Sequence, residues 1–143
     1  MERPWNHINI EECSESLENI PSLIYCLEPH PYISLGAPYP NGTSPWKLRS
    51  QVITLLVKAQ EILQGEFPSL QLAVFDAYRP ISVQSFMIQY SINQECLKRG
   101  LDRLKIDHTR EVDKVIKDVS RFWAEPSLDP LTPPPHSTGA AID

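Results

Sequence analysis

The chain has 143 residues, 41% of them hydrophobic, which is enough to supply the core of one soluble globular domain. Its formal net charge of −5 argues against a nucleic-acid partner, because such a partner requires a basic protein surface. No apolar run resembles a secretory signal or reaches the roughly 20 residues of a membrane helix. We therefore expect a cytoplasmic protein with no membrane partner. Three cysteines without a C-x-x-C pair indicate neither a disulfide framework nor a cysteine zinc site.

The N-terminal part of the chain is acidic and then rich in proline. In residues 1–28 the spacing of apolar and acidic residues allows a short amphipathic helix that ends before Pro21. Residues 28–45 read as loops and turns, and the pair Asn41-Gly42 predicts a tight turn there.

A helix and a strand are predicted in the middle of the chain. Ser44 as N-cap and Pro45 at the first helical position open a helix over 45–64, whose apolar residues recur at intervals of three and four. Residues 70–76 form a short apolar run between prolines, which predicts a largely buried strand. Its polar end would project Asp76 and the residues after it from the edge of a sheet.

Two more helices and a terminal strand are predicted downstream. A helix over 82–99 would be capped by Ser82 and stopped by Gly100. A third helix, over 109–123, has one apolar and one charged face. The proline-rich loop 126–135 then leads to the end of the chain.

These elements predict an α+β domain. Helices 45–64 and 82–99 would pack on one face of a mostly antiparallel sheet that includes strands 70–76 and 139–143. The whole of 1–143 is expected to be a single domain.

The end of the chain carries a candidate metal site. His136 and Asp143 can both ligate Zn²⁺ if the chain turns at Gly139 and then runs extended, since small residues at 140 and 141 let the backbone pass close beneath the metal. A surface histidine followed by a short buried strand explains the same residues, because two candidate ligands do not by themselves make a site.

Two motifs together resemble a known family. The sequence V-F-D-A-Y-R-P over 74–80 and the sequence P-P-H-S-T-G-A-A-I-D over 134–143 resemble the signature of the D-alanyl-D-alanine dipeptidases, the VanX-like branch of the M15 zinc peptidases. The resemblance runs from about residue 30 to the C-terminus. It implies a Hedgehog/D,D-peptidase-like fold, a Zn²⁺ cofactor and a small D-amino-acid dipeptide as substrate.

The resemblance also implies roles for individual residues. His136 and Asp143 match two zinc ligands, and Arg79 matches the catalytic arginine that donates to the carbonyl oxygen in the transition state. Asp76 could orient its guanidinium, whereas a surface salt bridge is the plainer interpretation of an arginine before a proline. Tyr78 is expected to pack beneath the pocket. The remaining histidines, His7, His30 and His108, are expected to be solvated or capping residues rather than ligands.

The chain departs from the family pattern at two points. Pro134 stands where the family commonly has a serine, and no Glu-x-x-His, the motif of the general base and the third zinc ligand, occurs in residues 1–143. We therefore expect the N-terminal portion of a longer zinc D,D-dipeptidase domain, with the missing glutamate and histidine beyond Asp143, on a C-terminal fragment or a second chain. Two alternatives are a shortened non-catalytic relative that binds small peptides, and a D,D- or L,D-carboxypeptidase of the same fold.

Overall fold

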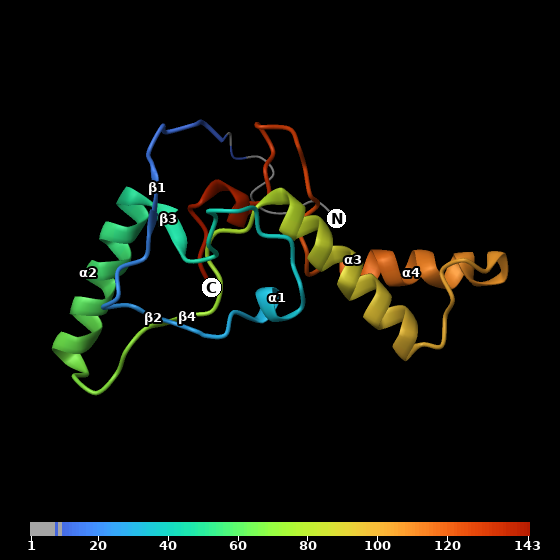
Figure 1. Cartoon of the computed structure of the whole chain (residues 1–143), viewed down its shortest axis with the longest axis horizontal. Helices are drawn as coiled ribbons and strands as arrows, with labels where there is room; N and C mark the ends of the chain where they lie inside the picture. The colour runs from blue at the N-terminus through green and yellow to red at the C-terminus, as the bar shows by residue number, and fades with distance from the viewer. Residues whose placement is uncertain (1–7, 9) are drawn as a thin grey trace.

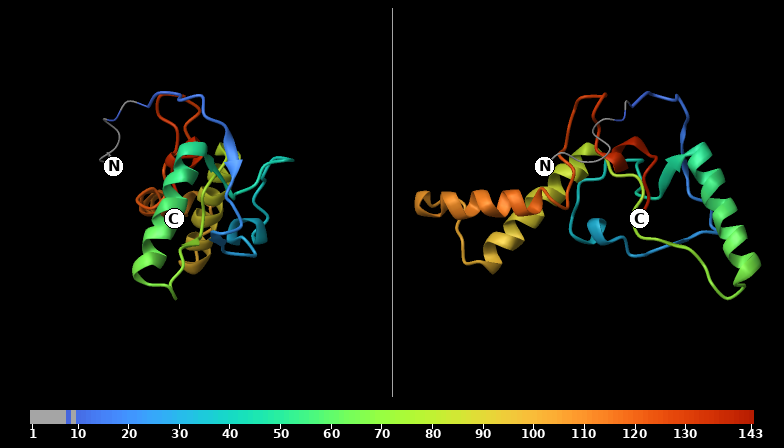
Figure 2. Two further views of the ribbon diagram at one scale, coloured as in Figure 1. Left: turned by 90° about the vertical axis from the view of Figure 1, so that its left-hand side faces the viewer. Right: turned by 180° about the vertical axis from the view of Figure 1, so that it is seen from behind.

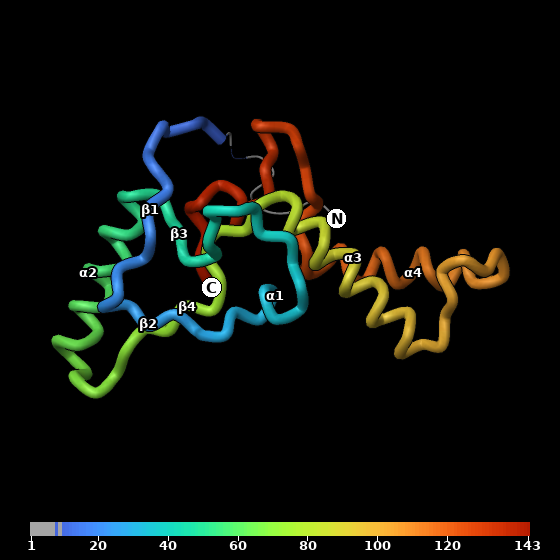
Figure 3. The backbone as a smooth tube through the Cα atoms, in the orientation of Figure 1, coloured from blue at the N-terminus to red at the C-terminus, as the bar shows by residue number. Residues whose placement is uncertain are grey.

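The computed structural model describes residue 8 and residues 10–143, and it shows an elongated molecule (Figure 1). Helix α2 (Ser50–Glu66) lies at one end, and the pair α3 (Ile81–Lys98) and α4 (Thr109–Val119) lies at the other. Short strands and loops join the two ends, and the C-terminus lies among them, as the tube in Figure 3 also shows. The middle of the molecule therefore collects segments that are far apart in the sequence.

Two small strand pairs form in this middle region. Strand β1 (Leu17–Asn19) pairs antiparallel with β3 (Lys47–Arg49), and β2 (Tyr25–Cys26) pairs parallel with β4 (Ala73–Val74). The helix considered for residues 1–28 is wrong where the structure describes them, because residues 17–19 are held extended by their pairing with β3. Helices and small sheets together agree with the α+β class, but a mostly antiparallel sheet is not confirmed.

Helix α2 starts later than predicted. Residues 47–49 belong to β3, so the helix begins at Ser50, and the hydroxyl of Ser44 accepts from the N–H of Trp46 instead of capping a helix. A residue distant in the sequence caps α2 instead, because Glu15 Oε2 accepts from the backbone N–H of Gln51 at 2.9 Å. Helix α2 packs against β1 and β3, and not on a sheet built from the predicted strands 70–76 and 139–143.

Helix α3 has nearly the predicted bounds but a different neighbour. Its N-cap is Pro80, and the hydroxyl of Ser82 donates to Pro38 O at 3.3 Å. Instead of packing on a sheet with α2, α3 packs against α4, and Figure 2 shows the two helices side by side, away from α2. The prediction failed because both helices carry apolar residues that complete each other's buried face. The buried residues of this pair are Ile92, Cys96, Val112, Val115 and Val119.

The connection into α4 and the exit from it are irregular. A short 3-10 turn (Ile106–His108) precedes α4, which ends at Val119 rather than at residue 123. At the end of the predicted helix, Phe122 is 83% exposed, whereas Trp123 is half-buried.

The C-terminal segment folds back onto the middle strands. A 3-10 turn (Pro135–Thr138) ends at Gly139, whose φ of 75° confirms the predicted turn. Residues 140–143 then run beside the chain that follows β4, where Asp143 N–H donates to Asp76 O at 2.9 Å. The strand predicted over 139–143 does not form. The backbone hydrogen bond between Asp143 and Asp76 nevertheless brings the side chains of these two residues together.

A small apolar core lies under these segments. It consists of Ile20, Ile24, Leu48, Val74 and Ala77. Among the described residues, no helix is both long enough and apolar enough to cross a membrane.

Candidate active site

Arg79 is buried at the centre of a polar network. Only 6% of the residue is exposed, and its Nε donates to Asp76 Oδ2 at 3.0 Å, while Nη2 contacts the same oxygen. Nη1 donates to Gln84 Oε1 at 2.7 Å, and Nη2 lies 3.4 Å from the hydroxyl of Tyr32. The expected pairing of Asp76 with Arg79 is confirmed, and the arginine is not a surface salt bridge.

Two neighbouring aromatic rings, whose centroids are 5.9 Å apart, contact the guanidinium. Its central carbon lies 5.1 Å from the ring centroid of Tyr32 and 4.9 Å from that of Trp123. Burial raises the pKa of Tyr32, although the nearby Arg79 opposes this shift, so the phenol stays protonated at neutral pH. The guanidinium is therefore fixed in orientation by its hydrogen bonds and by its contacts with the two rings.

Gln84 secures the arginine to a distant loop. It is 1% exposed, and its Nε2 donates to Ala124 O at 2.6 Å while its Oε1 accepts from Arg79. The first turn of α3 and the segment after α4 are thereby joined behind Arg79. Sequence reasoning missed both Gln84 and Trp123, because neither stands in a motif and each reaches Arg79 only through the tertiary fold.

His136 is held in the tautomer that a metal ligand needs. Its Nδ1 lies 2.8 Å from Ala77 O. A carbonyl oxygen only accepts, so Nδ1 carries the hydrogen of the neutral ring and Nε2 keeps its lone pair. A backbone carbonyl behind a histidine is a common way to orient a metal-binding ring. In addition, Ser137 donates its hydroxyl to Arg79 O at 2.7 Å, so this turn is tied directly to the arginine segment.

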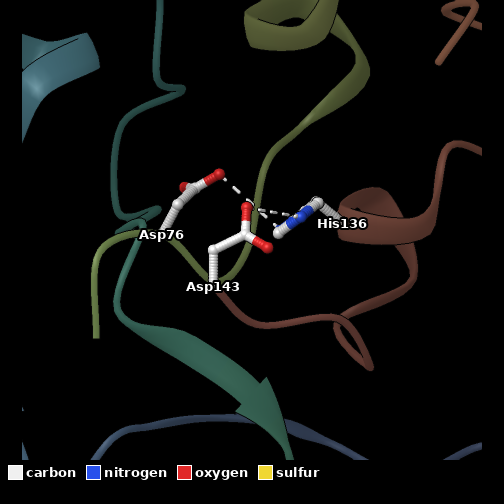
Figure 4. A group of neighbouring side chains, drawn as sticks. All are labelled: Asp76, His136 and Asp143. Atoms are coloured by element: carbon white, nitrogen blue, oxygen red, sulfur yellow. Dashed lines mark ion pairs between the residues drawn. The ribbon is translucent and has the colours of Figure 1, made fainter. Parts of the chain in front are cut away.

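Asp143 completes a pair with His136. One of its carboxylate oxygens, Oδ2, lies 3.3 Å from His136 Nε2, and Figure 4 shows the carboxylate directed toward the ring. The side chain of Asp143 is 60% exposed, and that of His136 is 14% exposed. The predicted turn at Gly139 therefore brings the two proposed ligands together from opposite ends of one short segment.

Asp76 is the third acidic or histidine side chain in this group. One potential ligand atom from each of Asp76, His136 and Asp143 lies within 4.8 Å of the others, an arrangement that could hold a cation. Asp76 is nevertheless engaged: Oδ2 accepts from Arg79, and Oδ1 lies 3.3 Å from His30 Nε2. Asp76 therefore orients Arg79, whereas His136 and Asp143 remain the candidate metal ligands.

His136 and Asp143 are of the residue types that bind zinc, but they are fewer than the three protein ligands of a catalytic zinc site. Imidazole nitrogen and carboxylate oxygen are both ordinary zinc ligands, and His136 Nε2 is available to bind. A catalytic zinc site uses three protein ligands and one open position. His136 and Asp143 would supply two of these, and Asp76, the third member of the group, is already engaged by Arg79.

The two proposed ligands and the arginine face one cavity of about 1100 Å³. Tyr78 is half-buried and is not among the described residues that line the cavity, which agrees with a packing role. The arginine, three residues that contact it and the two proposed ligands all line this cavity: Tyr32, Arg79, Gln84, Trp123, His136 and Asp143.

The other histidines have different environments. His30, expected to be solvated or capping, does cap α1 (Pro31–Ser34), but it is buried, with 3% exposed. His108 Nδ1 accepts from the N–H of Asp102 at 2.7 Å within a local loop. His7 lies outside the described residues.

Comparisons with known proteins show the family of the chain. A family model described as D-Ala-D-Ala dipeptidase, of peptidase family M15, matches residues 27–143. A curated relative from Synechocystis sp., described as D-alanyl-D-alanine dipeptidase, is 40% identical over 142 residues, which cover 99% of this chain and 57% of the relative. The chain thus spans little more than half the length of that relative, and no solved structure matched it. The match over most of the chain establishes that it belongs to the D-Ala-D-Ala dipeptidase family of the M15 peptidases.

Proposed function

We propose that this chain provides the substrate cavity, the transition-state arginine and two zinc ligands of a metallo-dipeptidase that hydrolyses D-Ala-D-Ala. The observation that carries the proposal is that Arg79, His136 and Asp143 line one cavity, with His136 Nε2 free of the carbonyl that holds Nδ1. Membership of the family supports hydrolysis of a dipeptide, and the name of the Synechocystis relative supports D-Ala-D-Ala as the substrate.

The metal would be held by His136 and Asp143. A bound zinc ion supplies Lewis acidity at the scissile carbonyl and a more acidic water. Residues 1–143 contain no Glu-x-x-His, so we propose that the general-base glutamate and the third ligand belong to a segment beyond them. The chain covers 57% of the Synechocystis relative, which supports a longer protein that includes such a segment. The expected cytoplasmic location stays a prediction.

Arg79 has one donor left for the substrate. A guanidinium carries five N–H groups, and four contacts engage it among the described residues: two to Asp76, one to Gln84 and one to Tyr32. The remaining N–H is on Nη1. It can donate to the substrate carbonyl oxygen as negative charge develops there, and it needs no reorganisation because the rest of the group is already anchored.

The test uses a matched set of assemblies. The 143-residue chain is assayed alone and together with a polypeptide that carries the uncovered portion of the Synechocystis relative. We expect hydrolysis of D-Ala-D-Ala and stoichiometric zinc only in the combined form. His136→Ala should remove zinc and activity together, because it deletes a ligand.

The substrate panel separates the family alternatives. It contains D-Ala-D-Ala, its N-acylated form and the L,L dipeptide. Preference for the acylated peptide would replace the proposal by a carboxypeptidase. Peptide binding without turnover in a zinc-loaded assembly would identify a non-catalytic relative.

A further inference from the structure

His30 is a buried histidine with a defined tautomer. It precedes α1, and its Nδ1 accepts from the backbone N–H of Tyr32 at 3.2 Å. An atom that accepts from a backbone N–H carries no hydrogen, so in the neutral ring the hydrogen is on Nε2. The ring is fixed by edge contacts with three aromatic side chains, at centroid distances of 5.1, 5.9 and 4.8 Å. These side chains are Tyr32, Tyr39 and Trp46.

The Nε2 atom of His30 faces Asp76 inside the protein. It lies 3.3 Å from Asp76 Oδ1, and Asp76 is fully buried. Both atoms are inaccessible to solvent and have no aligned hydrogen-bond partner among the described residues. At this distance each can satisfy the other, since an unsatisfied buried donor or acceptor is costly.

Asp76 connects this histidine to the arginine. Its second oxygen, Oδ2, accepts from Arg79 Nε and contacts Nη2, and it lies 3.6 Å from His136 Nδ1. His30 thus holds the carboxylate from the side opposite Arg79. Without that contact, the plane of the carboxylate would be held less firmly, and a tilt of this plane would change the direction of the hydrogen bonds from Arg79. The direction of the remaining Nη1 hydrogen would then be less well defined.

We propose that His30 is a positioning residue, which fixes the Arg79 guanidinium by holding the far oxygen of Asp76. The catalytic part of this inference rests on the proposed function of Arg79. The structural part does not, because it concerns only the orientation of a buried side chain.

Two substitutions separate the two contacts of His30. His30→Asn keeps a cap acceptor near the position of Nδ1 but has no atom that reaches Asp76. His30→Gln gives up the favourable cap and can place its amide donor near the position of Nε2. We expect His30→Asn to lower kcat roughly 10-fold with little change in KM, as loss of a supporting group does in metal sites. His30→Gln should stay within about threefold of the parent.

A coupling test shows whether the effect passes through Arg79. In an Arg79→Ala background, His30→Asn should cause no further loss of kcat, because residues that act through one another are not additive. An equal loss in both backgrounds, or a kcat of His30→Asn within twofold of the parent, would overturn the proposal.

Measurements on the 143-residue chain are independent of activity. A long-range ¹H–¹⁵N spectrum should show His30 protonated on Nε2, and a hydrogen on Nδ1 would refute the proposal even if no variant folds. The Arg79 Nε–H signal, assigned by its loss in Arg79→Lys, should weaken through faster exchange in His30→Asn and persist in His30→Gln. Identical Arg79 signals in the parent chain, His30→Asn and His30→Gln would also refute the proposal. Inactivity of the combined assembly with these signals as expected would count against the proposed function alone.

Discussion

Replacement of Arg79 by alanine should destabilise the fold as well as impair catalysis. Arg79 is 6% exposed, and its main partner, Asp76, is fully buried. Arg79→Ala would leave that carboxylate uncompensated, and removal of one partner of a buried ion pair costs about 3–5 kcal/mol. This is a large part of the roughly 5–15 kcal/mol that holds a typical domain together. For a chain of this size, we expect a fall in melting temperature of roughly 6–20 °C.

Denaturant and thermal unfolding of the 143-residue chain measure this cost. Arg99 offers a matched control, because it pairs with Glu95 and Asp118 while its side chain is 38% exposed. Arg99→Ala should cost about 1 kcal/mol or less, as exposed pairs usually do. The double change Arg79→Ala with Asp76→Asn should recover part of the loss, since the buried charge is gone. If Arg79→Ala were no more destabilising than Arg99→Ala, the buried pair would not have the energetic role inferred from the structure.

The catalytic effect is measured in the combined assembly at a temperature where the variant is folded. Arg79→Ala should lower kcat on D-Ala-D-Ala by about 10²–10³, with zinc content unchanged, because the lost donor acts on charge that appears only in the transition state. Arg79→Lys should not restore the rate fully, because an ammonium cannot reproduce the fork held by Asp76. A kcat of Arg79→Ala within twofold of the parent would show that Arg79 is only structural.

Three further predictions concern the turn at Gly139, the hydroxyl of Tyr39 and the binding of zinc. Gly139→Ala should lower the free energy of unfolding by about 1–3 kcal/mol and weaken zinc binding in the combined form, because Gly139 has a φ of 75° and a Cβ there would collide with the side chain of Leu17; unchanged unfolding would contradict this. Burial raises the pKa of Tyr39, so the folded state holds this proton more tightly, and stability should be retained below about pH 10 and fall above it. Tyr39→Phe should flatten that fall in pH-dependent urea unfolding and cost little at pH 7, since the hydroxyl has no hydrogen-bond partner among the described residues; an equally steep fall would exclude Tyr39 as its cause. Zinc titration of the 143-residue chain alone should show weak binding because only His136 and Asp143 are proposed as ligands, and tight stoichiometric binding would refute the assignment.

Local sequence patterns predicted the features that depend on neighbouring residues. The bounds of α3 agree with the predicted helix to within one residue, because apolar spacing and the flanking Pro80 and Gly100 act locally. The turn at Gly139 and the pairing of Asp76 with Arg79 were predicted for the same reason. The two motifs likewise identified the family, which the comparisons confirmed.

Only the tertiary structure decided which segments meet. The pairing of residues 47–49 with β1 displaced the start of α2 to Ser50, since a distant strand can override a favourable local helix start. Three residues around Arg79 and Asp76, namely His30, Gln84 and Trp123, come from segments whose local sequence shows no sign of this contact. Their roles depend on long-range packing, which fixes the orientation of a buried charge but leaves no periodic trace in the sequence.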